Sequence, residues 1–293
     1  MKILVAIDSS PASALVISQI SARPWPAEST FEVVTVADPS HVPDVAFDEV
    51  ERSATQVAEA GADRLLANNL KATAFLLQGH PKAAIVDRAQ AIGADFIVIG
   101  SHNGGGLGRF LLGGVASAVV RHAPCSVEVV RTPAHPAGAM KILLATDGSA
   151  NSLLAAHSIA ERPWPAESEV RVLTAVELSL TPWQSALEPP YLNNDMVETQ
   201  RAEAMKRAEK AIQSAEELLA STALKTAESI SVLIQSPKQI ILDEAKAWEA
   251  DLIVVGSHGR RGLDRFLLGS VSEAVAMHAP CSVEVIRSPA LED

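Results

Sequence analysis

The sequence predicts an α/β protein built from two tandem copies of one doubly wound domain, and two observations carry this prediction. The first is alternation, because short apolar runs that indicate buried strands are separated by helical stretches. This order is typical of a parallel sheet with helices on both faces. The second is an internal repeat. The segment RPWPAES occurs at residues 23–29 and at 162–168, and residues 100–131 align with 256–287 with 22 of 32 positions identical.

The two copies predict the same order of elements. A short apolar strand ending in Asp precedes the first helix, and Ser149 has the residue type of an N-cap. A second strand, a long polar helix, a third strand and a helix with proline in its first turn follow. The fourth strand is a continuous apolar run, which is typical of a central parallel strand, and a glycine loop and a helix lead to the fifth strand. The expected strands are 2–7, 30–36, 72–77, 95–100 and 126–131, then 141–146, 170–176, 228–234, 251–256 and 282–287; the expected helices are 10–22, 49–69, 149–161 and 196–220, with two more starting near Pro81 and Pro237.

The fifth strands differ from the others. Glu128 and Glu284 are each flanked by two valines, so polar and apolar residues alternate. Such alternation is typical of an edge strand or a strand with one buried face. We therefore expect the fifth strand to pair with another domain.

The offset between the copies predicts the domain boundaries. It is 139 at RPWPAES and 156 at the glycine loop, so the second copy carries a net insertion of 17 residues, which we place in the proline-rich stretch 177–195. The short stretch 134–139, rich in Pro, Ala and Gly, is typical of a linker. We expect one domain at 1–133 and another at 140–293.

Composition excludes several classes of protein. The net charge is −11 without a basic block, which disfavours nucleic acid as a partner. Two cysteines are too few for a disulfide framework. The first apolar run ends at Asp8, too early for a signal peptide, and no stretch approaches the roughly 18 apolar residues of a membrane helix. We expect a cytoplasmic protein that has no membrane partner.

The fourth strand of the second copy runs into a loop that predicts an anion site. Gly256 and Gly259 follow the strand, and Gly269 and Ser270 begin the next helix. Ligands of open α/β sheets bind beyond the carboxyl ends of the strands. Glycines let the backbone approach a ligand, and a helix N-terminus offers unpaired N–H groups and a positive dipole end. The loop therefore predicts a phosphate site, although it is neither a P-loop nor a G-x-G-x-x-G fingerprint.

The pattern G-x2-G-x9-G-[S/T] after a strand resembles the nucleotide-binding signature of the universal stress protein family. Gly256, Gly259, Gly269 and Ser270 match it completely, and the resemblance extends over both copies, including the APCSVEV-type final strand. The resemblance implies a five-stranded parallel sheet of order 3-2-1-4-5 in each copy. It also implies pairing of the copies through their fifth strands, and ATP binding in many members, although others bind no nucleotide.

Carried over residue by residue, the resemblance implies a cofactor site in the second copy. Asp147 would contact the adenosine half of the nucleotide, and the backbone of Val176 would contact adenine. The residues that would line ribose and phosphates are Gly256, His258, Gly259, Gly269, Ser270 and Val271. An Asp at the end of a strand can accept hydrogen bonds from ribose hydroxyls, and it can also cap the following helix; the two roles can coexist.

The first copy departs from the signature. Asn103 stands where the second copy has Gly259, and Gly114 stands where it has Ser270. Asn tolerates the left-handed conformation better than most residues, but glycine cannot replace the hydroxyl. We therefore expect a weaker or empty site in the first copy, at the positions Asp8, Val36, Gly100, His102 and Gly113.

Further features have both a functional and a plain structural interpretation. The repeated His-Ala-Pro-Cys at 122–125 and 278–281 supplies two ligands where zinc needs three or four, so we interpret it as a helix end and a buried cysteine. We interpret His258 as a loop residue that uses its backbone rather than as a general base. Arg260 could bind phosphate through its guanidinium group, but arginines in loops are more often solvated. The tryptophans of RPWPAES are expected to anchor the connection to the second strand.

These observations favour a regulatory protein that binds ATP or another adenine nucleotide, with or without Mg²⁺, mainly in the second copy. A slow ATPase is the less favoured hypothesis, because the sequence has no evident Mg²⁺ carboxylate cluster and no base–nucleophile pair. We expect at most weak ATP hydrolysis. A nucleotide-free interaction module is the other alternative, and association into a homodimer is left undecided.

Overall fold

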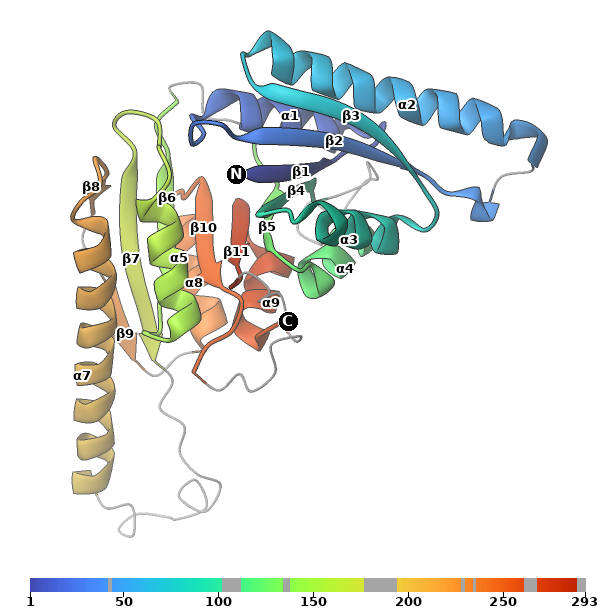
Figure 1. Cartoon of the computed structure of the whole chain (residues 1–293). Coiled ribbons are helices and arrows are strands. Elements are labelled where there is room, and N and C mark those ends of the chain that lie inside the picture. Colours follow the sequence, from blue (N-terminus) through green and yellow to red (C-terminus); the bar gives the residue numbers. More distant parts are fainter. Residues whose placement is uncertain are drawn as a thin grey trace.

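The computed structural model describes residues 1–41, 44–101, 112–133, 138–176, 194–227, 230–233, 236–260 and 268–288. Strands and helices alternate along the chain (Figure 1). The first copy contains β1 (Lys2–Ala6), α1 (Pro11–Ala22), β2 (Thr30–Ala37), the 3-10 turn η1 (Pro39–His41), α2 (Asp44–Ala67), β3 (Lys71–Gln78), α3 (Pro81–Ile92), β4 (Phe96–Gly100), α4 (Gly114–His122) and β5 (Ser126–Val130). The second copy contains β6 (Lys141–Ala145), α5 (Ala150–Ala160), β7 (Glu169–Val176), α7 (Asn194–Leu219), β8 (Lys225–Thr226), β9 (Ile230–Leu233), α8 (Pro237–Ala247), β10 (Leu252–Gly256), α9 (Ser270–His278) and β11 (Ser282–Ile286).

Local sequence explains where several helices begin and end. Pro81 and Pro237 occupy the first turns of α3 and α8, where a missing N–H costs nothing. Ser149 is the N-cap of α5, and its hydroxyl accepts a hydrogen bond from the Ser152 N–H at 3.3 Å. Gly93 ends α3 in the left-handed conformation, with φ of 59°. The predicted proline starts and the predicted cap are confirmed.

The eleven strands of the described residues form a single sheet in the order β3-β2-β1-β4-β5-β11-β10-β6-β7-β8, with β9 paired to β7. Within each copy neighbouring strands are parallel, so the predicted order 3-2-1-4-5 is confirmed. The third strand of the second copy differs from the expectation of one strand over 228–234. It is divided into β8 and β9, and both pair with β7.

The two copies join through their fifth strands. β5 and β11 run antiparallel, and Glu128 lies opposite Glu284, with a pair of valines on either side. The predicted pairing is therefore confirmed, and a homodimer would have to use another surface. β5 and β11 are the edge strands of their own copies, as one interpretation had it, but the alternative of a strand with one buried face was wrong, because every residue of both strands is buried in the continuous sheet.

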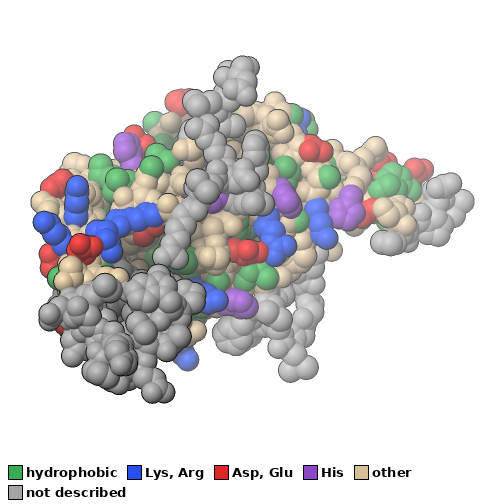
Figure 2. All heavy atoms as spheres, turned by 90° about the horizontal axis from the view of Figure 1, so that it is seen from below, with side chains coloured by type: hydrophobic (Ala, Val, Ile, Leu, Met, Phe, Trp, Pro, Cys, Tyr) green, Lys and Arg blue, Asp and Glu red, His purple; other side chains and the backbone are tan. Residues whose placement is uncertain are grey.

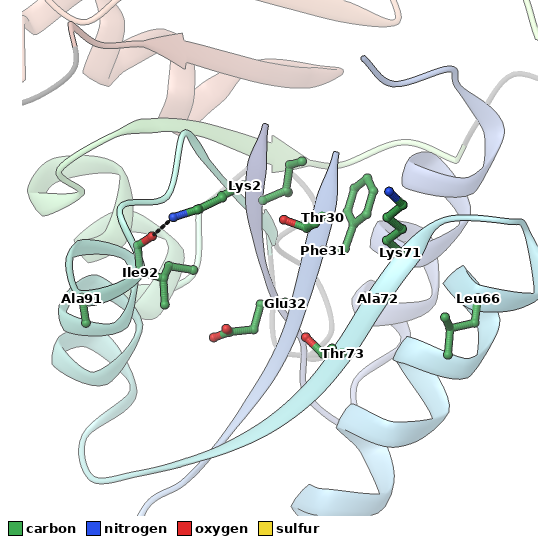
Figure 3. Close-up of a pocket in the computed structure, with 11 residues that line it drawn as sticks. Lys2, Thr30, Phe31, Glu32, Leu66, Lys71, Ala72, Thr73, Ala91 and Ile92 are labelled. Carbon is green, nitrogen blue, oxygen red and sulfur yellow. Dashed lines mark hydrogen bonds between the residues drawn. The ribbon is translucent and has the colours of Figure 1, made fainter. Parts of the chain in front are cut away.

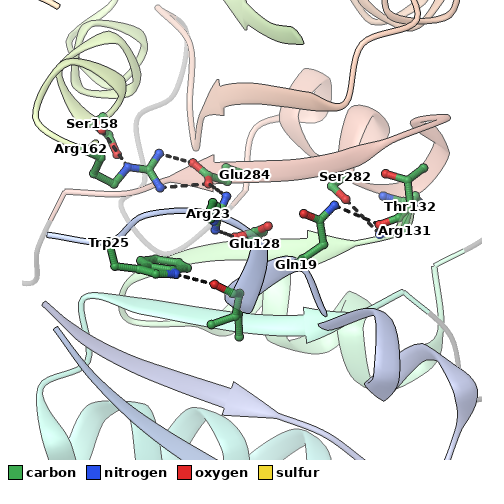
Figure 4. Close-up of polar contacts among 11 residues, drawn as sticks. Gln19, Arg23, Trp25, Glu128, Arg131, Thr132, Ser158, Arg162, Ser282 and Glu284 are labelled. Carbon is green, nitrogen blue, oxygen red and sulfur yellow. Dashed lines mark hydrogen bonds and ion pairs between the residues drawn. The ribbon is translucent and has the colours of Figure 1, made fainter. Parts of the chain in front are cut away.

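A buried cluster of two glutamates and two arginines explains the alternation (Figure 4). Arg23 pairs with Glu128 and also approaches Glu284 at 3.3 Å, while Arg162 binds Glu284 through hydrogen bonds of 3.0 and 2.5 Å. The four side chains are only 0–7% exposed. Burial raises the pKa of Glu128. Burial would also raise the pKa of Glu284, but the facing arginines outweigh it and hold that pKa below its ordinary value.

The RPWPAES repeat supplies these arginines and fixes the chain beside them. Trp25 and Trp164 donate hydrogen bonds from Nε1 to carbonyl oxygens near the ends of α1 and α5, at 2.9 and 2.8 Å. Each indole ring lies against the arginine two residues before it, with the guanidinium carbon 4.4 and 4.9 Å from the ring centroid. The interpretation of the tryptophans as anchors is confirmed.

Two apolar cores cover the two faces of the sheet, and each runs across both copies. One contains Ile97 and Ile253 and is covered by α3, α4, α8 and α9. The other contains Val98 and Val254 and is covered by α1, α2, α5 and α7. Because neither core stops at the β5–β11 junction, the packing energy of each copy depends on the other.

The ends of the strands differ in what they offer a ligand. A hollow of about 670 Å³ lies at the amino ends of β1, β2 and β3 (Figure 3). Its charges are already paired: Lys2 Nζ donates to the last carbonyl of α3 at 3.1 Å, Lys71 pairs with Glu28, and Glu32 pairs with Arg88. Gly100 and Gly256, which begin the two glycine loops, lie at the opposite, carboxyl ends of β4 and β10.

The surface carries mixed charge. On the face shown in Figure 2, acidic, basic and histidine side chains are interspersed over the described residues. None of the described helices has an apolar stretch long enough to cross a membrane.

Candidate functional site

A cleft of about 610 Å³ lies at the carboxyl ends of β6, β7 and β10, and we call it the second-copy cleft. The turn after β6, the glycine loop after β10 and the first turns of α8 and α9 surround it, and α7 contributes Arg207 and Ala208. The predicted residues that line it are Asp147, Gly256, His258, Gly259, Gly269, Ser270 and Val271. The side chain of the remaining predicted residue, Val176, lies outside the described residues, although its neighbour Ala175 lines the cleft.

Close packing surrounds two glycines of the loop, against backbone at Gly256 and against a side chain at Gly259. A Cβ on Gly256 would lie 2.5 Å from the backbone carbon of Asn151 at the start of α5. A Cβ on Gly259 would lie 2.6 Å from Oδ2 of Asp147. These contacts bring β10 and its loop against the turn that follows β6. Glycine at these positions therefore also serves the fold, besides any approach of a ligand.

Asp147 ties the two loops of the cleft together. Its Oδ1 accepts a hydrogen bond from the Ser149 N–H at 2.9 Å, and its Oδ2 accepts one from the Arg260 N–H at 3.0 Å. Burial would raise the pKa of Asp147, but the hydrogen bonds from Ser149 and Arg260 outweigh it and hold the pKa below its ordinary value. Asp147 is not the N-cap of α5, because Ser149 is. Hydrogen bonds from the side chains of Ser149 and Ser152 also lower the pKa of Asp147, so a ligand hydroxyl would compete with these serines for the carboxylate.

The N-terminus of α9 faces the cleft. Gly269 is its N-cap and donates its N–H to the Ser257 carbonyl at 2.8 Å, and Ser270 is exposed at the first helical position. Ser272, in the first turn of the helix, donates its hydroxyl to the Gly256 carbonyl at 2.6 Å. The first N–H groups of a helix have no intrahelical partner, so this end of α9 can receive an anion. His258 holds its Nδ1 3.2 Å from the Ser257 hydroxyl.

Most of the basic side chains that line the cleft were not predicted from the sequence. The structure brings Arg207 of α7, Lys238 of α8 and Arg260 to its lining, whereas the sequence singled out only Arg260 among them. Arg207 follows the buried Ala204 and precedes the buried Ala208 on the long polar helix. The helical period of those alanines could have indicated that it borders the sheet, but not that it reaches this cleft.

The corresponding part of the first copy is described only in part, because residues 102–111, with His102 and Asn103, lie outside the described residues. Asp8 accepts hydrogen bonds at 2.9 Å on Oδ1 from the Ser10 N–H and from the Ser13 hydroxyl. Gly100 ends β4, Gly113 is the N-cap of α4, and Val36 lies near the end of β2. The weaker first site stays a prediction.

The His-Ala-Pro-Cys repeats have structural surroundings. His122 and His278 are the last residues of α4 and α9, as predicted. Cys125 and Cys281 are free and buried, and burial raises the pKa of each thiol to about 12. Within the described residues, no three His, Cys, Asp or Glu side chains converge as metal ligands.

Known proteins resemble the chain in sequence. A profile of the universal stress protein family matches residues 1–131 and again residues 139–287. A universal stress protein of Mycobacterium tuberculosis is 31% identical over 234 residues, covering 78% of this chain and 71% of the relative. Another, from Methanocaldococcus jannaschii, is 33% identical over 152 residues, covering 52% of this chain and 84% of that protein.

Solved structures resemble it in fold over both copies. A universal stress protein from Archaeoglobus fulgidus has a TM-score of 0.68 and 19% identity, covering 99% of this chain and 97% of that one. A protein from Pseudomonas aeruginosa described as a putative universal stress protein has a TM-score of 0.62 and 18% identity, covering 98% and 92%. At this level of identity the likeness shows the fold alone.

Proposed function

The chain belongs to the universal stress protein family, and from this premise we propose that its second copy binds ATP or a related adenine nucleotide as a regulatory signal in a stress response. One observation carries the proposal. The signature residues Gly256, Gly259, Gly269 and Ser270 and the strand-end Asp147 converge on a single cleft of about 610 Å³. Ligand pockets of this kind typically measure about 300–1,000 Å³.

Each part of the cleft has a role in this proposal. The N–H groups at the start of α9 and the Ser270 hydroxyl bind phosphate oxygens, because the helix end is positive. Asp147 accepts hydrogen bonds from ribose hydroxyls, which replace those of the neighbouring serine side chains. Leu173, Ile241 and Val255 supply apolar surface for the base. Asp147 is the only carboxylate in the described lining, so any Mg²⁺ would depend mainly on phosphate oxygens and water.

The proposed outcome of binding is a change in stability and partner choice rather than turnover. A ligand that binds only the folded state at a hundredfold excess over Kd stabilises it by about 2.7 kcal/mol. Because both apolar cores cross the junction, this stabilisation would reach the first copy as well. We propose that the first copy binds nucleotide weakly or not at all, since Gly114 has no hydroxyl where the second copy has Ser270.

The test combines mass spectrometry of small molecules released from the purified chain with calorimetric titration of ATP. We expect about one nucleotide per chain. Ser270→Gly, which installs the first copy's residue, should weaken binding, and Gly114→Ser is the matched change in the first copy. Two nucleotides per chain would contradict the weak first site. No binding at millimolar ATP would contradict the proposal and favour a nucleotide-free interaction module.

A further inference from the structure

The second-copy cleft gathers positive charge in an acidic part of the chain. Residues 140–293 contain 14 Lys and Arg against 22 Asp and Glu. Among the described residues lining the cleft, however, Arg207, Lys238 and Arg260 face one carboxylate, that of Asp147. The charged side chains of the lining therefore sum to +3 − 1 = +2, opposite in sign to the surrounding half of the molecule. A charge reversal confined to a cleft favours an anionic ligand.

The first copy lacks two of these three cations. Both copies have a Leu-Lys pair after the long helix, at 70–71 and at 224–225, which gives an offset of 154. At this offset Arg207 corresponds to Ser53. At the glycine-loop offset of 156, Arg260 corresponds to Gly104 and Lys238 to Lys82. With Asp8 in place of Asp147, the corresponding sum is +1 − 1 = 0. The two copies have therefore diverged by two positive charges at aligned positions of the sequence.

The three cations come from three separate parts of the cleft. Arg260 Nη2 lies 3.0 Å from the position that a Cβ on Gly148 would take, so its guanidinium lies across the turn that holds Asp147. Lys238 stands in the first turn of α8. The ammonium of its counterpart Lys82 lies 4.0 Å from the Cβ position of Gly114, at the start of α4. A lysine at this position can therefore reach the helix end that would receive a phosphate.

Arg207 approaches from α7 on the other side of the cleft. Its side chain is 53% exposed, and its ion pair with Glu203 is long, at 3.8 Å. Such an exposed pair holds the guanidinium only weakly, so an anion in the cleft can compete for it.

We propose that Arg207 and Lys238 set the specificity of this cleft by the number of phosphate charges on the ligand. They favour a triphosphate over a monophosphate. This inference rests on the proposed function, which supplies the adenine nucleotide as ligand. The attraction between the cations and the phosphate charges applies to any polyphosphate. Attraction to the ligand grows with each added phosphate charge, whereas contacts to the nucleoside are the same for all of them.

The test is calorimetric titration of the full chain with ATP, ADP, AMP and inorganic tripolyphosphate, at low and high salt. The variants are Arg207→Ser, which installs the first copy's residue, and Lys238→Gln. We expect each variant to bind ATP and tripolyphosphate about two- to fivefold more weakly, because an exposed ion pair contributes that much to affinity. The affinity for AMP should be nearly unchanged. The preference for ATP over AMP should fall as salt rises. Arg201→Ser is the matched control, because Arg201 lies on the same helix at 51% exposure and does not line the cleft.

The probes separate this inference from the proposed function. Equal affinity for ATP and AMP, unchanged in both variants, would overturn the inference and leave nucleotide binding standing. Tripolyphosphate binding that depends on Arg207, without ATP binding, would support the inference and overturn the proposed function. Binding of neither ligand would overturn both. An equal loss in Arg201→Ser would show a general surface-charge effect and would also overturn the inference.

Discussion

Glu128 and Glu284 lie directly opposite each other where β5 meets β11, and the guanidinium of Arg23 contacts both carboxylates. Two acids at such a position would repel one another and resist burial. The arginines of the two RPWPAES segments neutralise them, so each copy brings one acid and one base to the junction. Each copy's pair is therefore neutral by itself, and the contact of Arg23 with Glu284 links the two pairs across the junction.

Glu284→Gln should destabilise the chain more than Glu128→Gln. Glu284 accepts hydrogen bonds from both arginines, so its loss removes both carboxylate hydrogen bonds of Arg162, whereas loss of Glu128 leaves both arginines in contact with Glu284. Removing one partner of a buried ion pair costs about 3–5 kcal/mol. Urea unfolding should show a loss of that order for Glu284→Gln. Glu273→Gln is the control, because its pair with Arg121 is exposed and worth at most about 1 kcal/mol. Equal stability of the two buried variants would contradict the assigned pairing.

A second ion pair has opposite polarity in the two copies. In the first copy Glu32 of β2 binds Arg88 of α3. At the corresponding positions, Arg171 of β7 binds Glu244 of α8. We expect Arg88→Glu alone to destabilise the first copy by about 1 kcal/mol or more, because like charges then meet at a half-buried site.

The double variant Glu32→Arg with Arg88→Glu should recover most of the stability that Arg88→Glu loses, since the second copy accommodates that polarity at the same place. The measurement is a double-mutant cycle by urea unfolding. A coupling energy near zero would show that the helix packs on the strand independently of these charges.

The glycine that ends the fourth strand should differ in importance between the copies. A Cβ on Gly256 would lie 2.5 Å from the backbone of α5, whereas a Cβ on Gly100 would lie 3.0 Å from the Cβ of Ala12. Gly256→Ala should therefore cost more than the roughly 1–3 kcal/mol of ordinary overpacking, and Gly100→Ala should fall within that range. Thermal unfolding of the two matched variants measures the difference. Equal melting temperatures would contradict the tighter packing in the second copy.

The fold could be predicted in advance because its signals are local and repeated. Apolar strands, proline at helix starts and the offset between copies indicated two parallel sheets of similar construction, and the family resemblance implied their strand order. Contacts between distant residues could not be predicted. Arg23 meets Glu128 across 105 residues, so the alternation in β5 looked like a solvent-facing pattern. Arg207 reaches the cleft only because of how α7 packs on the sheet, which no motif encodes.

The hydrogen bonds of Asp147 should make the stability of the second-copy cleft depend on pH. The pKa of Asp147 is lowered below its ordinary value of 3.8, so its contribution is present above that value and is lost as pH falls through the folded pKa. Asp147→Asn would place a donor opposite the Arg260 N–H and remove one charge-assisted bond, a loss of about 1–3 kcal/mol at neutral pH. Urea unfolding of both proteins from pH 7 downward should show this difference shrinking in acid. A difference independent of pH would mean that the carboxylate charge does not hold the loop, and that shape alone keeps Gly259 against the turn after β6.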